Sequence, residues 1–267
     1  MIKNAKKIVI KVGTSTLTYD TGLLNIRKIE KLCNVICDLQ NSGKQIILVS
    51  SGAISAGWSK IGLASRPTTT EERQAAAAVG QNELMNFYDR NMEKYGKVVA
   101  QILLTKDAID NPLRRHNAES TLKLLLEHGC IPIVNENDCV SCEEIKFGGN
   151  DTLSAYVACL ADADLLINLS DVDGLFDSDP RKNPDAKLIP VVEDPDSVLS
   201  MASGAGTQRG TGGMFVKITA AKIAGDKEIP MIIANGEDPA ILYDILESDE
   251  HRVGTLFVPS NGKEVKL

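Results

Sequence analysis

Residues 8–15, which read IVIKVGTS, predict how this chain folds. The first five are β-branched apart from Lys11 and show no apolar–polar alternation, which is typical of a strand buried on both faces of a parallel sheet. Gly13 and two hydroxyl residues follow directly. Because ligands of open α/β sheets bind beyond the carboxyl ends of the strands, the residues that follow each strand are the first candidates for a binding site.

Short apolar runs of the same kind recur along the chain. They occupy residues 46–49, 98–103, 131–134, 165–169, 231–234 and 254–258. Helical patterns lie between them, such as residues 25–40, with apolar residues at helical spacing, and residues 113–128, which end at Gly129. This alternation predicts an α/β fold in which a mostly parallel sheet is covered by helices on both faces and joined by right-handed crossovers.

The chain shows neither linker composition nor an internal repeat, so we expect a single domain over residues 1–267. The segment 171–195 is rich in Asp and Pro and has little periodicity. Such a segment predicts a long loop, and long ordered loops are often functional.

The composition excludes several classes of protein. Hydrophobic residues make up 43% and charged residues 24%, which excludes a disordered or collagen-like chain. The 29 Lys and Arg against 36 Asp and Glu give a net charge of −7 without a basic run, so we expect no nucleic-acid partner. No apolar stretch approaches 18 residues, so we expect no membrane span, no signal peptide and a cytoplasmic location.

The cysteines and histidines predict no metal or redox chemistry. Six cysteines in a cytoplasmic chain are typical of reduced thiols, and residues 139–142 (CVSC) form a lone C-x-x-C without a second pair or a nearby histidine. The three histidines lie far apart in the sequence. We therefore expect no metal-ligating residue among them.

Two strand ends predict anion binding. Lys11 lies inside an apolar strand, where a lysine is unfavourable unless it meets an anion, and Gly13 allows a close backbone approach. The alternative is a lysine that extends to solvent from the strand end. Residues 50–57 (SSGAISAG) open a helix whose first N–H groups are suited to a phosphate or carboxylate, although small residues also allow close helix–sheet packing.

The segment 203–214 (SGAGTQRGTGGM) contains five glycines and precedes a helical run that carries Lys217. Backbone N–H groups at a helix start, together with a lysine, predict a phosphate cradle, and a flexible linker is the alternative. The chain contains no G-x-x-x-x-G-K-[ST], which disfavours a P-loop protein, and Arg209 stands where G-x-G-x-x-G needs its third glycine, which disfavours a nicotinamide-dependent dehydrogenase.

Residues 134–138 (VNEND) and 149–152 (GNDT) add carboxylates and amides at the same edge of the predicted sheet. Such groups suit the ammonium of an amino-acid substrate. The alternative for Asn150 or Asp151 is that the side chain only caps the helix predicted over residues 152–160.

Taken together and in chain order, these segments resemble the amino acid kinase family. The resemblance also includes residues 173–176 (DGLF) and 179–181 (DPR), and its most specific parts are residues 135–138 (NEND) and 210–214 (GTGGM). It implies a three-layer αβα sandwich that uses ATP and Mg²⁺ to phosphorylate the side-chain carboxylate of L-glutamate, the first step of proline biosynthesis. Residues 1–160 would bind the amino acid and residues 161–267 would bind ATP.

The resemblance also implies individual roles by motif position. Three residues would be catalytic: Lys11, Lys217 and Asp151. Asp151 would hold the two lysines in place. The ATP site would comprise Lys11, Gly13, Ser170, Asp171, Thr211, Gly212, Gly213, Met214 and Lys217. The substrate site would comprise Ser51, Gly52, Ala53, Asp138 and Asn150.

Two departures from the family pattern accompany these roles. Gly149 stands where relatives often carry an acidic residue, and the chain ends at Leu267, without room for the C-terminal PUA domain that many members acting on glutamate append. The partners implied are a second copy of the chain, proline as a feedback inhibitor and a glutamyl phosphate reductase. The open alternatives are a family member acting on N-acetylglutamate, aspartate, carbamate or UMP, and a non-catalytic amino-acid sensor.

Charge accounting indicates what such a reaction requires. A glutamate side chain with a pKa of about 4.3 is ionised at neutral pH, so its attack on phosphorus needs no general base. The barrier is the repulsion between this anion and the phosphates, which cations and N–H donors reduce. We therefore expect Lys11 and Lys217 to act electrostatically.

Overall fold

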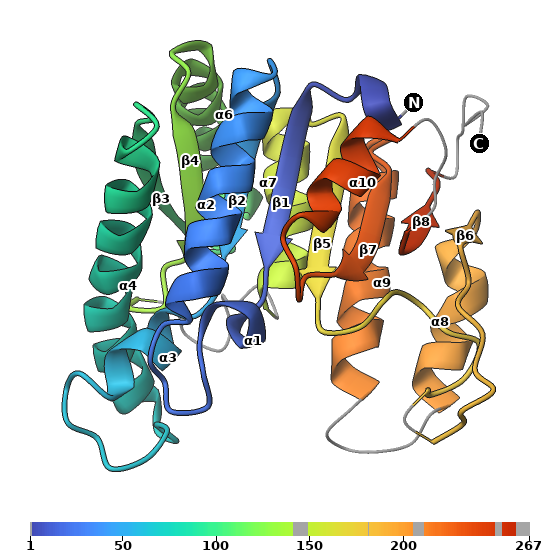
Figure 1. Ribbon diagram of the computed structural model, residues 1–267, viewed down its shortest axis with the longest axis horizontal. Coiled ribbons are helices and arrows are strands. Elements are labelled where there is room, and N and C mark those ends of the chain that lie inside the picture. The colour runs from blue at the N-terminus through green and yellow to red at the C-terminus, as the bar shows by residue number, and fades with distance from the viewer. Residues whose placement is uncertain (1, 141–148, 181, 205–210, 249–252, 260–267) are drawn as a thin grey trace.

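A computed structural model describes residues 2–140, 149–180, 182–204, 211–248 and 253–259. Within these ranges, eight strands form a sheet in the order β3-β4-β2-β1-β5-β7-β8-β6 (Figure 1). Neighbouring strands are parallel except β7 and β8, which are antiparallel. The strands are β1 Lys7–Val12, β2 Gln45–Ser50, β3 Val99–Leu104, β4 Ile131–Glu136, β5 Leu165–Ser170, β6 Val191–Val192, β7 Met231–Asn235 and β8 Thr255–Phe257.

The predicted strands are confirmed with small shifts of their ends. β1, β2, β4 and β5 are buried along nearly their whole length, as their uninterrupted apolar runs predict. The prediction of one long loop over residues 171–195 is wrong in part. That segment contains β6, which pairs with β8, and an isolated bridge between Phe176 and Leu188.

Helices cover both faces of the sheet. They are the 3-10 helix η1 Ile2–Asn4 and the α-helices α1 Thr14–Leu17, α2 Ile26–Asn41, α3 Ala53–Trp58, α4 Thr70–Glu93, α5 Asp107–Asp110, α6 Pro112–Glu127, α7 Asn150–Ala161, α8 Pro195–Gly204, α9 Thr211–Gly225 and α10 Ile241–Glu247. The side chain of Asn25 accepts the N–H of Lys28 to cap α2, and Thr69 and Glu72 form a capping box on α4.

Two apolar clusters hold the layers together. Ile8 and Ile10 of β1 belong to a cluster that includes buried residues of α2, α4 and α10, whereas Val9, between them, belongs to the cluster on the other face, with residues of α6, α7, α8 and α9. This alternation follows from the period of two along a strand. Figure 1 shows helices on both faces of the sheet. The three-layer αβα fold with a mostly parallel sheet is therefore confirmed.

Helix α3 lies unusually close to α4. A Cβ atom added to Gly57 would lie 1.8 Å from the carbonyl oxygen of Ala76, and one added to Gly80 would lie 1.8 Å from that of Ala53. The two backbones are therefore in direct contact. The small residues after β2 allow this contact between two helices, whereas the sequence predicted close packing of a helix on the sheet. Helix α3 begins at Ala53, close to the end of β2.

Candidate active site

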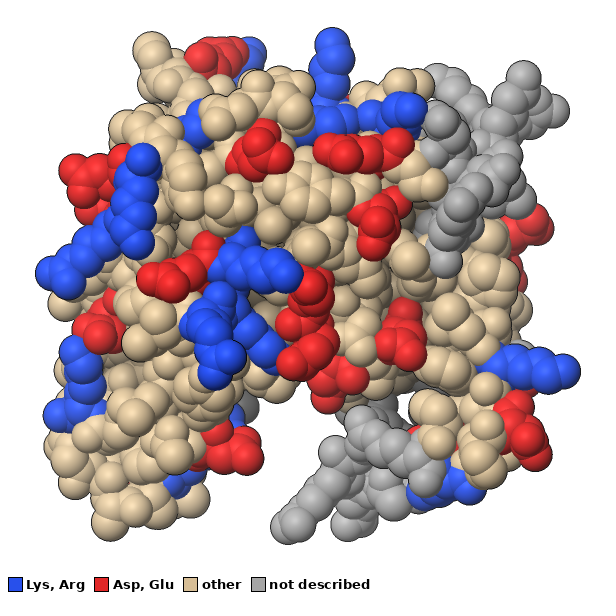
Figure 2. Space-filling view, viewed as in Figure 1, with Lys and Arg blue, Asp and Glu red and all other residues tan. Residues whose placement is uncertain are grey.

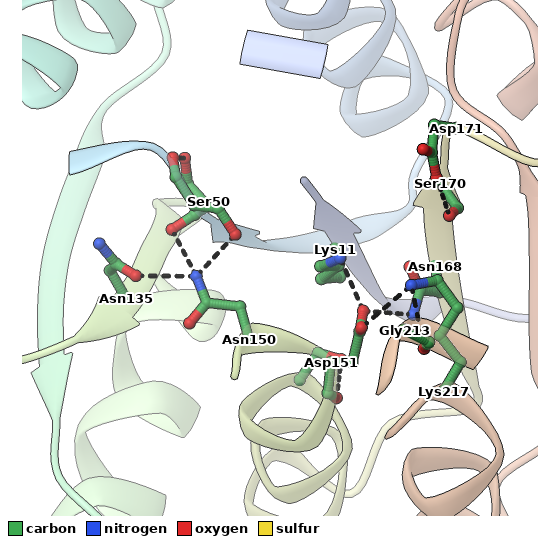
Figure 3. Close-up of polar contacts among 12 residues, drawn as sticks. Lys11, Ser50, Asn135, Asn150, Asp151, Asn168, Ser170, Asp171, Gly213 and Lys217 are labelled. Carbon is green, nitrogen blue, oxygen red and sulfur yellow. Dashed lines mark hydrogen bonds and ion pairs between the residues drawn. The ribbon is translucent and has the colours of Figure 1, made fainter. Parts of the chain in front are cut away.

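The carboxyl ends of β1, β2, β4 and β5 meet at one edge of the sheet, and the N-terminus of α7 lies among them (Figure 3). Helix α7 begins at Asn150, and its N-cap is Gly149, which makes no side-chain capping bond. The interpretation of Asn150 and Asp151 as helix caps is therefore wrong. Both are helical residues whose side chains make contacts with the strand ends.

Asp151 joins the two lysines that the sequence singled out. Its Oδ1 lies 2.6 Å from Nζ of Lys11, and its Oδ2 lies 3.1 Å from Nζ of Lys217. Nζ of Lys217 also lies 3.5 Å from the carbonyl oxygen of Gly213. Lys11 and Lys217 are only 6% and 8% exposed, so both ammonium groups are largely removed from water. The cluster carries two positive charges against one negative charge.

Burial and charge act against each other in this cluster. Burial lowers the pKa of Lys11, the negative charge of Asp151 raises it, and the positive charge of Lys217 lowers it further. The net effect is a pKa below the ordinary value of a lysine. Burial alone would raise the pKa of Asp151, but the charges of the two lysines and the hydrogen bonds from Lys11 and Asn168 hold it below its usual value. Asp151 is therefore ionised at neutral pH and able to hold both ammonium groups.

Asn150 organises a second set of contacts on the other side of α7 (Figure 3). Its Nδ2 lies 3.1 Å from the carbonyl oxygen of Ser50, 2.9 Å from Oγ of Ser51 and 2.9 Å from Oδ1 of Asn135. The amide of Asn135 in turn donates to Oε1 of Gln81 on α4 at 2.9 Å. These bonds tie the ends of β2 and β4 to α7 and α4.

A pocket of about 530 Å³ adjoins the lysine cluster, because Asn150 lines the pocket and the next residue, Asp151, holds the lysines. The space-filling view is hollowed at this edge, between the α3 side and the α8 side (Figure 2). All residues predicted to bind the substrate line the pocket: Ser51, Gly52, Ala53, Asp138 and Asn150. Charged residues of both signs also line it: Arg66, Arg73, Glu136 and Asp138.

The residues predicted to bind ATP gather at the same edge as far as the structure describes them. A Cβ atom added to Gly13 would lie 3.7 Å from Nζ of Lys11. Ser170 ends β5, and its hydroxyl donates to Oδ1 of Asp171 at 3.2 Å. Helix α9 begins at Thr211, inside the glycine-rich segment that was predicted to precede the helix. Residues 205–210 and the side chain of Thr211 lie outside the described part of the chain.

Comparison with known proteins shows the family to which the chain belongs. The model of the amino acid kinase family matches residues 6–235, a range that includes every residue of the lysine cluster and the pocket. The chain belongs to the amino acid kinase family.

Relatives within the family match over nearly their whole length. A protein of Clostridium perfringens named glutamate 5-kinase is 51% identical and covers 98% of each chain. A protein of the same name from Clostridium acetobutylicum is 52% identical and covers 97% of each.

Solved structures support the fold. UMP kinase from Bacillus anthracis superposes with a TM-score of 0.65 at 20% identity, covering 97% of each chain. Isopentenyl phosphate kinase from T. acidophilum superposes with a TM-score of 0.66 at 17% identity, covering 94% of this chain and 100% of that one. At these identities the likeness establishes the amino acid kinase fold alone.

Two residues of this site, Gln81 and Asn168, were not predicted from the sequence, and Asn135 was placed at the sheet edge without a role of its own. Asn135 and Gln81 form the hydrogen-bonded path from α7 to α4, and Asn168 contacts Asp151 from β5. Asn168 had a signal, since it is a lone amide within the apolar run 165–169. Gln81 had none, because its partner lies 54 residues away.

Gly149 has a backbone conformation that favours glycine. Its φ of +122° lies in the left-handed half of the conformational map, so an acidic side chain would be strained in this backbone.

The cysteines of the described residues form no disulfide. Cys33, Cys37, Cys130, Cys139 and Cys159 are free thiols, and Cys142 lies outside the described residues. In the described ranges, no three His, Cys, Asp or Glu side chains come together in a way that would hold a metal ion. Among the helices described, none has the length and hydropathy needed to cross a bilayer.

Proposed function

We propose that this protein transfers the γ-phosphoryl group of ATP to the side-chain carboxylate of L-glutamate, forming L-glutamyl 5-phosphate for proline biosynthesis. Full-length relatives named glutamate 5-kinase at about 50% identity support this choice of acceptor. The observation that carries the proposal is the pair of buried lysines on Asp151, directly beside a polar pocket.

The pocket supplies groups of the charges that an amino acid requires. Asp138 and Glu136 present carboxylates that suit the substrate ammonium, and Arg66 and Arg73 present guanidinium groups. Gly52 adopts a φ of +100° at the N-cap of α3, and both Gly52 and Ala53, the first residue of that helix, line the pocket. The first N–H groups of a helix have no partner within the helix. We propose that these groups fix the substrate while its side chain extends towards the lysines.

The lysines supply the electrostatic part of the reaction. A carboxylate nucleophile carries its negative charge towards a phosphate that is also negative, and Lys11 and Lys217 offset this repulsion. Asp151 keeps the two ammonium groups apart at fixed positions, so they need little rearrangement when charge develops between nucleophile and leaving group.

ATP is the phosphoryl donor that membership of the kinase family implies. We propose that Mg²⁺ enters with the nucleotide, since this ion prefers phosphate oxygens, water and one or two carboxylates. Asp171, a carboxylate at the end of β5, fits that donor set and would hold the ion. When bound, Mg²⁺ would neutralise charge on the phosphate oxygens.

We propose a division of labour within the single domain: residues 1–160 bind glutamate and residues 161–267 bind ATP. The pocket lining within residues 14–150 supports the first part. The proposal has four further parts. The protein forms a homo-oligomer, is inhibited by proline, passes its labile product to a glutamyl phosphate reductase and is located in the cytoplasm.

The proposal is tested by trapping the acyl phosphate. Purified protein is incubated with ATP, Mg²⁺, hydroxylamine and one of four acceptors: L-glutamate, N-acetylglutamate, aspartate or UMP. We expect γ-glutamyl hydroxamate from L-glutamate and no product above background from the other carboxylates. ADP release with UMP, or hydroxamate from another acceptor, would replace the proposed substrate. Folded protein that binds ATP and phosphorylates none of them would favour a sensor.

A further inference from the structure

Asn168 is a polar side chain in the middle of an apolar strand. It is 0% exposed and lies on β5 among Leu165, Leu166, Ile167 and Leu169, which are equally buried. Its Nδ2 donates a hydrogen bond of 2.7 Å to Oδ1 of Asp151. Among the described residues, its Oδ1 is buried and has no hydrogen-bond partner. Within the described residues, the amide therefore makes a hydrogen bond through its nitrogen, to Asp151, and none through its oxygen.

Stability alone does not account for an amide at this position. A buried carbonyl without a partner is unfavourable, and an apolar side chain of the same shape would fill the space without that penalty. The hydrogen bond that Asn168 donates ends on the carboxylate that holds both lysines, so this bond acts within the proposed site.

The geometry shows what this bond does to Asp151. Oδ1 receives Asn168 together with Lys11, and Oδ2 receives Lys217. Lys11 and Asn168 are direct partners in the parallel ladder of β1 and β5. Strand β5 thus provides a rigid donor, whereas the lysines reach Asp151 on flexible stems. Without Asn168, rotation of the carboxylate would be restrained by those two stems alone.

We propose that Asn168 is a positioning residue for phosphoryl transfer, fixing the orientation of the Asp151 carboxylate so that Lys11 and Lys217 occupy their working positions. This inference rests on the proposed function and deepens it. Asn168 is not among the described residues that line the pocket, so we do not expect it to touch the glutamate bound there.

The first test compares Asn168→Leu, which keeps the branched shape and removes the donor, with Ile167→Leu, a volume-conserving change at the next position, facing the opposite side of β5. For Asn168→Leu we expect kcat to fall about 10- to 100-fold, with the glutamate KM within about threefold of wild type. The melting temperature should change by less than about 4 °C, because a bond and an unpaired carbonyl are removed together. Ile167→Leu should leave kcat unchanged.

The second test asks whether Asn168 acts through Asp151. In the Asp151→Asn background, Asn168→Leu should change kcat by less than about twofold, because the carboxylate that it positions is already gone. A merely structural residue would lower kcat by the same factor in both backgrounds. Asn168→Val carries the same predictions if the leucine variant does not fold.

The outcomes are decisive in either direction. Three results would overturn the inference. They are a wild-type kcat in Asn168→Leu or Asn168→Val, a fall in kcat by the same factor in the wild-type and Asp151→Asn backgrounds, and a loss of kcat accompanied by a large fall in melting temperature. The assay uses whichever acceptor the wild-type protein phosphorylates. A different acceptor therefore refutes the proposed function and still leaves the effect of Asn168 measurable.

Discussion

At the scale of single residues, Asp151 determines where the positive charges of the site lie. One carboxylate receives two ammonium groups and one amide, and each of its oxygens is in use. Because the lysines are buried, each would be costly without this anion. The position of either lysine therefore depends on Asp151, and a substitution at any one of these three residues should alter the positions of the other two.

The two lysines are predicted to act on the transition state. In Lys11→Ala and Lys217→Ala we expect kcat to fall about 10²- to 10³-fold, the usual effect of losing one electrostatic stabiliser. Lys222→Ala is the control, since that lysine lies on the same helix as Lys217 and pairs with Asp196 at the surface. Steady-state kinetics with glutamate and ATP give the comparison, and a kcat near wild type would remove that lysine from the mechanism.

Asp138 is predicted to act on substrate binding. It lines the pocket and is not part of the lysine cluster, so Asp138→Asn should raise the glutamate KM about tenfold or more and leave kcat within a fewfold of wild type. Asp89→Asn on the exposed side of α4 changes the net charge equally and should have no effect. An unchanged glutamate KM in a folded Asp138→Asn protein would contradict the assignment.

At the scale of elements, the contact between α3 and α4 shapes the pocket. Gly57 and Gly80 allow the two helix backbones to touch. Helix α4 also provides Gln81, which holds Asn135, and Tyr88, whose hydroxyl lies 2.8 Å from Oγ of Ser50. The position of α4 therefore affects the positions of the ends of β2 and β4, where the proposed substrate binds.

Gly80→Ala is predicted to damage both stability and substrate binding. A methyl group there would meet the carbonyl of Ala53, so α4 must shift, at a cost of about 1–3 kcal/mol in the free energy of unfolding. The glutamate KM should rise because Gln81 moves with the helix. Ala78→Ser, at an exposed position of the same helix, is the control. Urea unfolding and kinetics are the measurements, and wild-type values in both would refute the coupling.

At the scale of the whole molecule, the lysine cluster joins parts of the chain that are far apart in sequence. Lys217 lies 66 residues beyond Asp151, and Lys11 belongs to the first strand. Their meeting point is the edge where β1 and β5 lie side by side at the centre of the sheet (Figure 1). The ion pairs therefore form only when both halves of the sheet are assembled.

The contribution of Asp151 to stability is predicted to depend on pH. Its pKa is lower in the folded protein than its ordinary value of 3.8, so its ionised form stabilises the fold above that value. The contribution is lost as the pH falls through the lower folded pKa. Asp151→Asn should lower the free energy of unfolding by about 3 kcal/mol at pH 7, since it leaves two buried lysines without their anion.

Urea unfolding at stepwise lower pH tests this prediction. The difference between wild type and Asp151→Asn should persist from pH 7 to about pH 4 and shrink below it. A difference that is constant down to the lowest pH with a native baseline would mean that the charge of Asp151 is not what stabilises the fold.

Much of the fold follows from local sequence patterns. The strand runs and the helix over residues 25–40 carry their signals in a few neighbouring residues, and these predictions are confirmed. Strand β6 was missed, because its two residues form a strand only by pairing with β8, 65 residues later. The lysines and the polar segments after β2 and β4 were recognised as candidates from their types and places alone.

The sequence by itself determined the order of strands and helices, and it placed the charged and polar residues at the strand ends, because both depend on residues near one another in the chain. Only the tertiary structure decided their partners. It directs Asn150 to the strand ends and Asp151 to both lysines, where the sequence left helix caps as an alternative, and it brings Asn168 to Asp151. The reason is physical: these contacts join segments that come together only when the helices pack on the sheet.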